Sequence, residues 1–78
     1  MVTVGRAFGY RFVIYSNDHG PPHVHVVGNG GEARILLGHD DVTLDEVWGI
    51  GRNDMRKLLE EARLHRADFL KAWRDVHG

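Results

Sequence analysis

The sequence predicts a small two-layer α+β domain, in which an antiparallel meander of three to four strands is followed by one long C-terminal helix. Residues 1–47 alternate apolar and polar side chains with a period of two and place turn-forming residues between the runs. Residues 53–76 repeat apolar side chains every three or four positions, which is the period of an amphipathic helix. One apolar sheet face and one apolar helix stripe then bury each other. The 78 residues form a single domain, 1–78, with a sheet half at 1–47 and a helical half at 53–76.

The first predicted strand lies in "GYRFVIYS", residues 9–16, which is rich in aromatic and β-branched residues. "HVHVVG" (23–28) and "EARILL" (32–37) predict the next two strands. The "GNGG" between them predicts a tight hairpin, because glycine and asparagine tolerate positive φ. A short fourth strand is predicted near "DVTL", residues 41–44. The period of two assigns these side chains to the core face: Phe12, Ile14, Val24, Val26, Ala33, Ile35 and Leu37.

The opposite face of the predicted sheet carries His23 and His25. It also carries Val13 and Tyr15, and the segment after the sheet carries Trp48. Such a small domain has one helix to cover one sheet face, so these three apolar side chains predict a homodimer or a complex with a small partner protein.

The predicted helix begins with Asn53 as its N-cap and Asp54 in its first turn. No proline follows Pro22, so nothing in the sequence must break the helix. A kink is expected near residues 64–66, where Arg66 enters the apolar stripe. "DEVWGIGR" (45–52) is interpreted as the connection from sheet to helix. The stripe consists of Met55, Leu58, Leu59, Ala62, Phe69, Leu70 and Trp73.

Composition excludes several classes of function. Ten Lys and Arg balance eleven Asp and Glu, and the basic residues of the helical half are interleaved with acids, so nucleic-acid binding by the isolated domain is disfavoured. Cysteine is absent, which excludes disulfides and thiolate metal sites. No segment approaches the roughly 20 apolar residues of a membrane span, and the N-terminus lacks the features of a signal peptide. We therefore expect a cytoplasmic protein with no membrane association.

The candidate site is "DHGPPHVHV", residues 18–26, which holds three of the six histidines. A His-x-His pair on a strand directs two imidazoles to one face, and Asp18 and His19 in the preceding turn complete a candidate ligand set with His23 and His25. Nitrogen and oxygen ligands suit zinc, nickel, copper or iron rather than calcium, so zinc is the first candidate cofactor. The two prolines are expected to stiffen the turn, and Gly20 is expected to allow the chain reversal.

Two other interpretations of this segment stay open. In one, Asp18 caps a turn, the Gly-Pro-Pro corner shapes the chain, and the histidines simply stand on a strand face. In the other, a histidine acts as a general acid or base without a metal. A serine-based triad is disfavoured because Ser16 is the one serine and has no evident third partner. "GNGG" lacks the lysine of a phosphate-binding loop.

Three strings, "GYRFVIYSNDHGPPHVHV", "GEARILL" and "LKAWRDVHG", resemble the family called domain of unknown function 4160. The resemblance spans nearly the whole chain. It departs at "GHDDVTLDEVWGIGRND", where members have a shorter helix start that begins with proline. The family motif falls on Asp18, His19, Pro21, Pro22, His23 and His25.

The resemblance implies that the chain is a small protein-interaction domain. Members are often encoded beside a second family, domain of unknown function 2442, which implies one half of a toxin–antitoxin-like or regulatory two-gene module. The alternative is a histidine-based, metal-dependent enzyme, such as a nuclease, that uses the segment from Asp18 to His25. An interaction domain should expose an apolar patch, whereas an enzyme should gather the four candidate ligands around one concave pocket.

Overall fold

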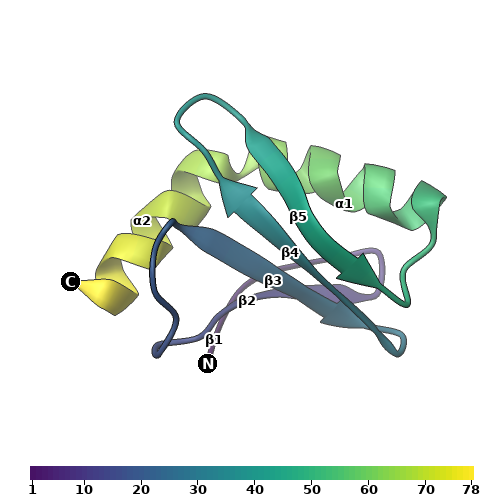
Figure 1. The fold of residues 1–78 in the computed structure, drawn as a ribbon, viewed down its shortest axis with the longest axis horizontal. Coiled ribbons are helices and arrows are strands. Elements are labelled where there is room, and N and C mark those ends of the chain that lie inside the picture. Colours follow the sequence, from purple (N-terminus) through teal and green to yellow (C-terminus); the bar gives the residue numbers. More distant parts are fainter.

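The computed structural model describes residues 1–78 and contains one five-stranded antiparallel sheet and two helices (Figure 1). The strands lie side by side in chain order, as a meander. This confirms the α+β class and corrects two details, because the sequence predicted three to four strands and one helix. The elements are β1 (Val2–Ala7), β2 (Tyr10–Ile14), β3 (His23–Gly28), β4 (Gly31–Leu37), β5 (Val42–Trp48), α1 (Arg52–Leu64) and α2 (Arg66–His77).

The additional strand is β1, which pairs with β2 from Val2↔Ile14 to Ala7↔Tyr10. Its sequence, "VTVGRA", alternates too briefly before Gly5 to predict a strand, and the register shifts at that glycine. The pairing with β2 therefore supplies what the local pattern lacks. Because β1 makes β2 an interior strand, Val13 has neighbours on both sides, Thr3 and His25, and is fully buried. The expectation that Val13 needs an external cover is wrong.

The strand β5 continues to Trp48 through the segment that the sequence assigned to a connection. The acidic residues Asp45 and Glu46 are uncommon in strands, so the sequence favoured a loop at this position. In the structure both carboxylates approach Arg34 of β4, at 2.6 and 3.4 Å, so their charges are compensated on an exposed strand. The hydrogen bond that Arg34 donates to Asp45, and to a lesser degree the charge of Glu46, raise the pKa of Arg34.

The hairpin between β3 and β4 forms where the glycine-rich segment predicts it. Gly28 pairs with Gly31, and the two residues between them, Asn29 and Gly30, have φ of 50° and 77°. Positive φ at both central positions is the geometry that favours Asn-Gly in two-residue hairpins.

The helical half is interrupted at His65, whose φ of −107° and ψ of 16° leave the helical region and separate α1 from α2. The sequence located this irregularity but predicted one continuous or kinked helix. The N-cap is also different: Gly51 precedes α1 with extended backbone and accepts the hydrogen bond of Met55 N–H, whereas Asn53 lies inside the helix. Neither helix is long and apolar enough to cross a membrane.

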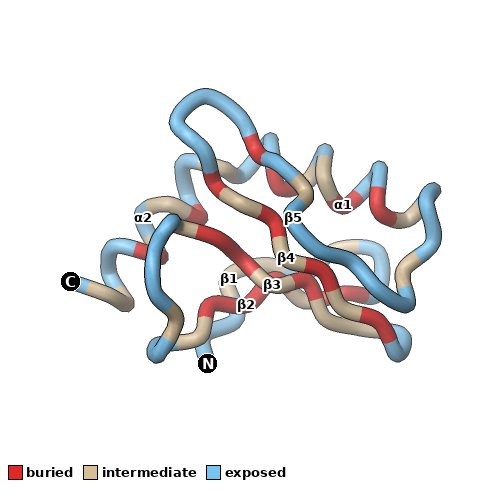
Figure 2. The backbone as a smooth tube through the Cα atoms, in the orientation of Figure 1, coloured by how far each residue is buried: buried red, intermediate tan, exposed pale blue.

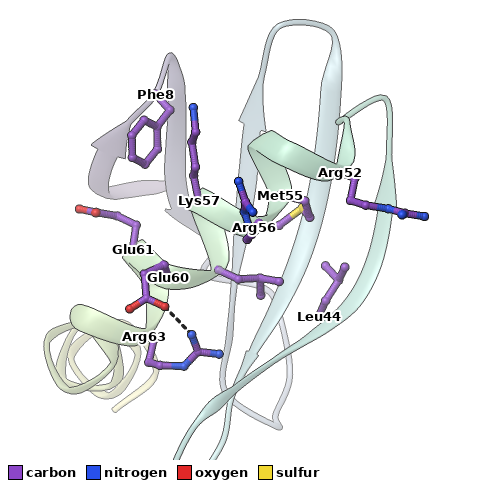
Figure 3. A pocket seen from close by; sticks show the side chains of 10 residues that line it. Phe8, Leu44, Arg52, Met55, Arg56, Lys57, Glu60, Glu61 and Arg63 are labelled. Carbon is purple, nitrogen blue, oxygen red and sulfur yellow. Dashed lines mark hydrogen bonds and ion pairs between the residues drawn. The ribbon is translucent and has the colours of Figure 1, made fainter.

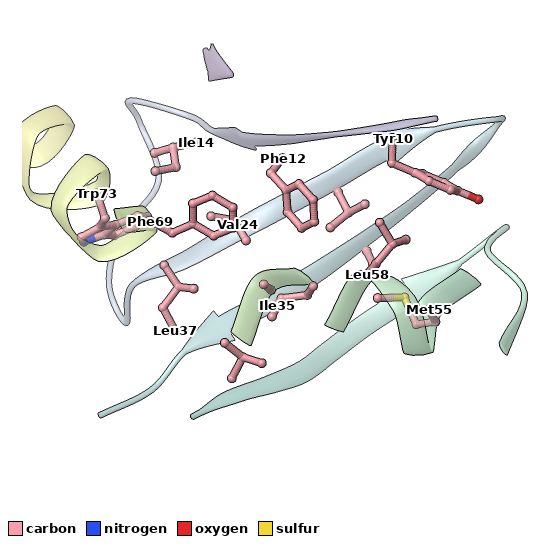
Figure 4. Packing of buried hydrophobic residues seen from close by; sticks show 14 residues of the cluster. Tyr10, Phe12, Ile14, Val24, Ile35, Leu37, Met55, Leu58, Phe69 and Trp73 are labelled. Carbon is pink, nitrogen blue, oxygen red and sulfur yellow. The ribbon is translucent and has the colours of Figure 1, made fainter. Parts of the chain in front are cut away.

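The break lets two separate stripes cover the sheet, Met55, Leu58 and Ala62 from α1, and Phe69 and Trp73 from α2. All seven predicted strand residues are buried in the resulting core (Figures 2 and 4). The rings of Phe12 and Phe69 meet at 5.2 Å and join the sheet to α2.

A substitution at Gly31 tests how closely the sheet approaches the segment before α1. A Cβ at Gly31 would lie 2.6 Å from the carbonyl carbon of Gly49 and 2.7 Å from Ile50 Cγ1. Because the first neighbour is backbone, it cannot rotate away, and Gly31→Ala should lower the free energy of unfolding by about 2–3 kcal/mol. Urea denaturation measures this loss. The control is Gly51→Ala, whose Cβ would meet nothing within 4 Å. Equal effects of the two substitutions would contradict the close approach.

Candidate functional site

The loop between β2 and β3, residues 15–22, brings Asp18 against the first residues of β3. A turn begins the loop, with Asp18 N–H donating to the Tyr15 carbonyl at 3.1 Å. The other end is anchored by Leu37 N–H, which donates to the Pro22 carbonyl at 2.9 Å. Gly20 is not among the residues with positive φ, so the expectation that it makes the reversal is wrong. The turn at residues 15–18 starts the reversal instead.

Asp18, His23 and His25 converge on one point. Nε2 of each histidine lies 3.0 Å from the same carboxylate oxygen, Asp18 Oδ2. One ligand atom from each of the three residues lies within 4.8 Å of the others. The side chains of the two histidines are 8% and 13% exposed and that of Asp18 is 24% exposed, so solvent reaches the group mainly at the carboxylate.

The outer nitrogen of each imidazole also has a partner, and each partner is an acceptor. His23 Nδ1 lies 2.9 Å from the Pro21 carbonyl oxygen, and His25 Nδ1 lies 3.2 Å from Glu32 Oε2. A carbonyl or carboxylate oxygen cannot donate, so each Nδ1 must carry the hydrogen and donate it. In a neutral imidazole this leaves Nε2 as a lone pair, and both lone pairs then face Asp18.

That arrangement brings three electron-rich atoms close together, and they repel one another unless positive charge is shared among them. One proton on Asp18 would satisfy one histidine but not the other. Both contacts are therefore attractive only if two protons are shared among the three atoms, for example one on each Nε2, or if a metal cation lies among them. The second option matches metal-binding histidines generally, which donate the outer N–H to a carboxylate or backbone carbonyl.

Glu32 was not among the residues that the sequence singled out. It is the second residue of β4 and pairs with Val27, so its proximity to His25 depends on the register between β3 and β4. The hairpin at residues 28–31 fixes that register. Counting back from it would have placed Glu32 near His25, which is the one signal in the sequence that points to this residue.

His19 stands apart from the other three candidate ligands. It is exposed and lies outside the group formed by Asp18, His23 and His25. It lines a hollow of about 350 Å³ beside His23, together with Gly20, Pro21, Arg34, Leu36 and Asp45. Asp18 and His25 do not line this hollow, so the four candidate ligands do not surround one pocket as the enzyme interpretation expected. The largest hollow, about 770 Å³, lies along α1 instead (Figure 3).

Aromatic rings hold the two histidines in place. Tyr15 meets the His25 ring edge-on at 4.7 Å, and the His23 ring lies 5.0 Å from Trp73 of α2. His77 in turn stacks on Trp73 at 3.8 Å. The sequence placed both histidines away from the core, but His23 is buried against Trp73, a member of the core cluster.

The comparisons with known proteins give one match. The family model described as "Domain of unknown function (DUF4160)" matches residues 9–74. This range contains β2 to β5, the whole candidate site and nearly all of both helices. No curated protein and no solved structure matches the chain.

Proposed function

We propose that this chain, which belongs to the domain of unknown function family DUF4160, binds one divalent transition-metal ion through Asp18, His23 and His25. The observation that supports the proposal is the direction of the imidazole lone pairs. Pro21 and Glu32 take the Nδ1 hydrogens, and both Nε2 atoms face one carboxylate oxygen at 3.0 Å. A bound cation makes this arrangement favourable without charging either ring.

The donor set favours zinc. Two imidazole nitrogens and one carboxylate oxygen suit zinc and its neighbours in the first transition row, whereas calcium and magnesium prefer oxygen ligands alone. Ligand atoms bound to a tetrahedral zinc at roughly 2.0–2.1 Å are about 3.3 Å apart. The two Nε2–Oδ2 separations of 3.0 Å are close to that spacing, so small movements suffice to admit the ion.

Three protein ligands leave one tetrahedral position for water, which is the pattern of catalytic rather than structural zinc sites. A zinc ion held by Asp18, His23 and His25 would make a water bound at that position a nucleophile near neutral pH. We therefore propose a hydrolytic activity, with phosphodiesters as the substrate class, as in a nuclease. His19 and Arg34 line the hollow beside His23 and offer hydrogen-bond donors for a phosphate group, although Arg34 is also paired with Asp45 in the same hollow.

The test is a calorimetric titration of the chelator-treated chain with Zn²⁺, with Mg²⁺ as the comparison. We expect one Zn²⁺ per chain and no heat with Mg²⁺. Zinc at about 100 times its dissociation constant should also raise the free energy of unfolding by about 2.7 kcal/mol. Co²⁺ in place of Zn²⁺ adds an optical spectrum that reports coordination directly. No uptake of Zn²⁺ or Co²⁺, together with an unchanged melting temperature, would refute the proposal.

We propose protein binding as a second function, because Val47 and Trp48 at the end of β5 are 41% and 58% exposed. Apolar side chains at a sheet edge are typical of contact surfaces. This supports the interaction-domain interpretation, and a partner protein of a toxin–antitoxin-like or regulatory module is the proposed role. Sedimentation of the purified chain distinguishes a homodimer from a monomer that needs a different partner.

A further inference from the structure

The largest hollow of the molecule lies along α1 and reaches from β5 to the turn between β1 and β2 (Figure 3). Four apolar side chains line it: Phe8 of the turn between β1 and β2, Leu44 of β5, and Met55 and Leu59 of α1. Arg52, Arg56 and Arg63 lie on the same side of α1, because they are spaced by four and seven residues along the helix. The hollow thus combines an apolar lining with arginines from successive turns.

The strand beside this hollow has one free side. In the sheet order β5 is the last strand, so the outward N–H and C=O groups along it have no neighbouring strand. Leu44 and Val47 pair with Ile35 and Ala33, whose side chains lie in the core. Their side chains therefore face the helices, and the free edge of β5 runs along the apolar lining.

The charges at this hollow are unbalanced near the start of α1. Arg63 is paired with Glu60 and Asp41, each at 2.7 Å. Arg52 and Arg56 form no ion pair with any residue of the chain, although both line the hollow. A segment bound here is attracted if it carries carboxylates toward α1.

A second copy of this chain fits poorly. Pairing β5 with another β5 would bring Asp45 and Glu46 of both copies together, and like charges on facing strands are destabilising. The other free edge, β1, carries Arg6 and no acid, so it cannot complement Arg52 and Arg56. These charges favour a different protein as the partner.

We infer that the free edge of β5 and the hollow along α1 together bind an extended segment of a partner protein, which adds to the sheet as a sixth strand. Strand addition derives affinity from main-chain hydrogen bonds and specificity from alternate side chains. The side chains that face α1 are apolar where they meet Leu44 and Leu59, and acidic at the end near the start of α1, toward Arg52 and Arg56. The inference rests on the protein-binding function proposed above and gives it a surface and a partner class.

The probe is the acetylated and amidated peptide Glu-Thr-Glu-Thr-Val-Thr-Leu, whose two Glu side chains are spaced like Arg52 and Arg56, titrated into ¹⁵N-labelled chain and followed by NMR. Its acidic and apolar side chains all lie on one face of a strand. We expect shifts at residues 42–48 and 52–59, and weaker binding in high salt. The peptide with Lys in place of both Glu should bind about tenfold less tightly, because two favourable charge pairs become repulsive.

The variant Arg52→Glu/Arg56→Glu provides the matched charge swap. Both side chains are exposed, so the fold should be kept. This variant should prefer the lysine peptide to the glutamate peptide. N-methylation of alternate peptide amides separates strand addition from simple burial in the hollow. Methylation of the amides that face β5 should abolish binding, and methylation of the other set should leave it intact.

Three results would overturn the inference. They are no shifts along β5 with peptide in large excess, equal affinity for the glutamate and lysine peptides, and indifference to both methylation patterns. A chain that sediments as a dimer while the peptide fails to bind also overturns it, although the protein-binding function would then stand on another surface.

Discussion

The substitution His25→Gln is expected to lower the affinity of the chain for Zn²⁺ by more than about 100-fold while the fold remains intact. Loss of an outer-shell partner already costs roughly 10–100-fold in metal affinity, and His25 is proposed as a direct ligand. With one of three protein ligands gone, the ion keeps only Asp18 and His23. Calorimetry with Zn²⁺ measures the loss, and far-UV circular dichroism reports whether the fold is kept.

Two matched variants should change the zinc affinity less than His25→Gln does. His19→Gln removes an exposed imidazole from the same loop but outside the converging group, so zinc affinity should not change. Glu32→Gln keeps the side-chain size but removes the carboxylate that accepts from His25 Nδ1 at 3.2 Å. It should weaken zinc binding about tenfold, as expected of an outer-shell group. If His19→Gln and His25→Gln lower the affinity equally, the ligand set proposed here is wrong.

His25 is the better test residue because its neighbour has a second role. The sequence indicated that both histidines face away from the core. In the structure the His23 ring lies 5.0 Å from Trp73, and only 7% of the residue is exposed. A substitution at His23 therefore alters packing between β3 and α2 as well as the metal site. A lower zinc affinity of His23→Gln could therefore result from loss of the ligand or from altered packing between β3 and α2.

The sequence predicted the core strands well because each carries its own periodic pattern. The seven core residues assigned from alternation are all buried, and Asn29-Gly30 forms the predicted turn. The prediction from sequence failed where pairing with a neighbouring strand determines the structure. The segment "VTVGRA" becomes β1 because β2 lies beside it, and Asp45 and Glu46 stay in β5 because Arg34 of β4 compensates them.

The candidate site divides in the same way. Local spacing predicted that His23 and His25 share a face and that Asp18 returns to them, and these three do converge. The acceptors that fix their tautomers were not predictable from the motif. Glu32 lies near His25 only because of the register of β3 and β4. The acceptor for His23 is the backbone carbonyl of Pro21, and every residue has a carbonyl, so the residue type does not predict this contact. The same limit placed His19 in the ligand set, because sequence proximity does not give the direction of a side chain in a loop.

The sequence near residue 65 indicated that the helix is irregular there, but it did not indicate which distant contact accompanies the break. The apolar stripe admits Arg66, which indicated a kink there, and the structure ends α1 two residues before it, at Leu64. Arg66 instead begins α2 and donates to the Gly38 carbonyl at 2.8 Å. This contact joins the start of α2 to the turn between β4 and β5, 28 residues away, which no helical periodicity includes.

Because the helical half is interrupted at His65, α1 must be held against the sheet by its own packing contacts. Leu58 contributes a fully buried side chain to this packing. Its side chain is 0% exposed and sits between Met55 and Ala62 in the stripe that faces the core (Figure 4). Leu58→Ala removes buried apolar atoms and leaves a cavity, which should cost about 3 kcal/mol. A domain of this size has roughly 4–12 kcal/mol of stability in total, so the loss is a large fraction.

The same helix supplies the control, since Leu64 is 70% exposed. Leu64→Ala makes the same chemical change at a site without packing, and alanine and leucine differ little in helix propensity. It should therefore change the free energy of unfolding by less than about 0.5 kcal/mol. Urea denaturation of both variants, in the presence of chelator, measures the difference without a contribution from metal binding. Because the two substitutions share their chemistry and their helix, a difference of about 3 kcal/mol isolates the burial of Leu58 against the sheet. Equal effects would show that α1 is not packed on the sheet through this face.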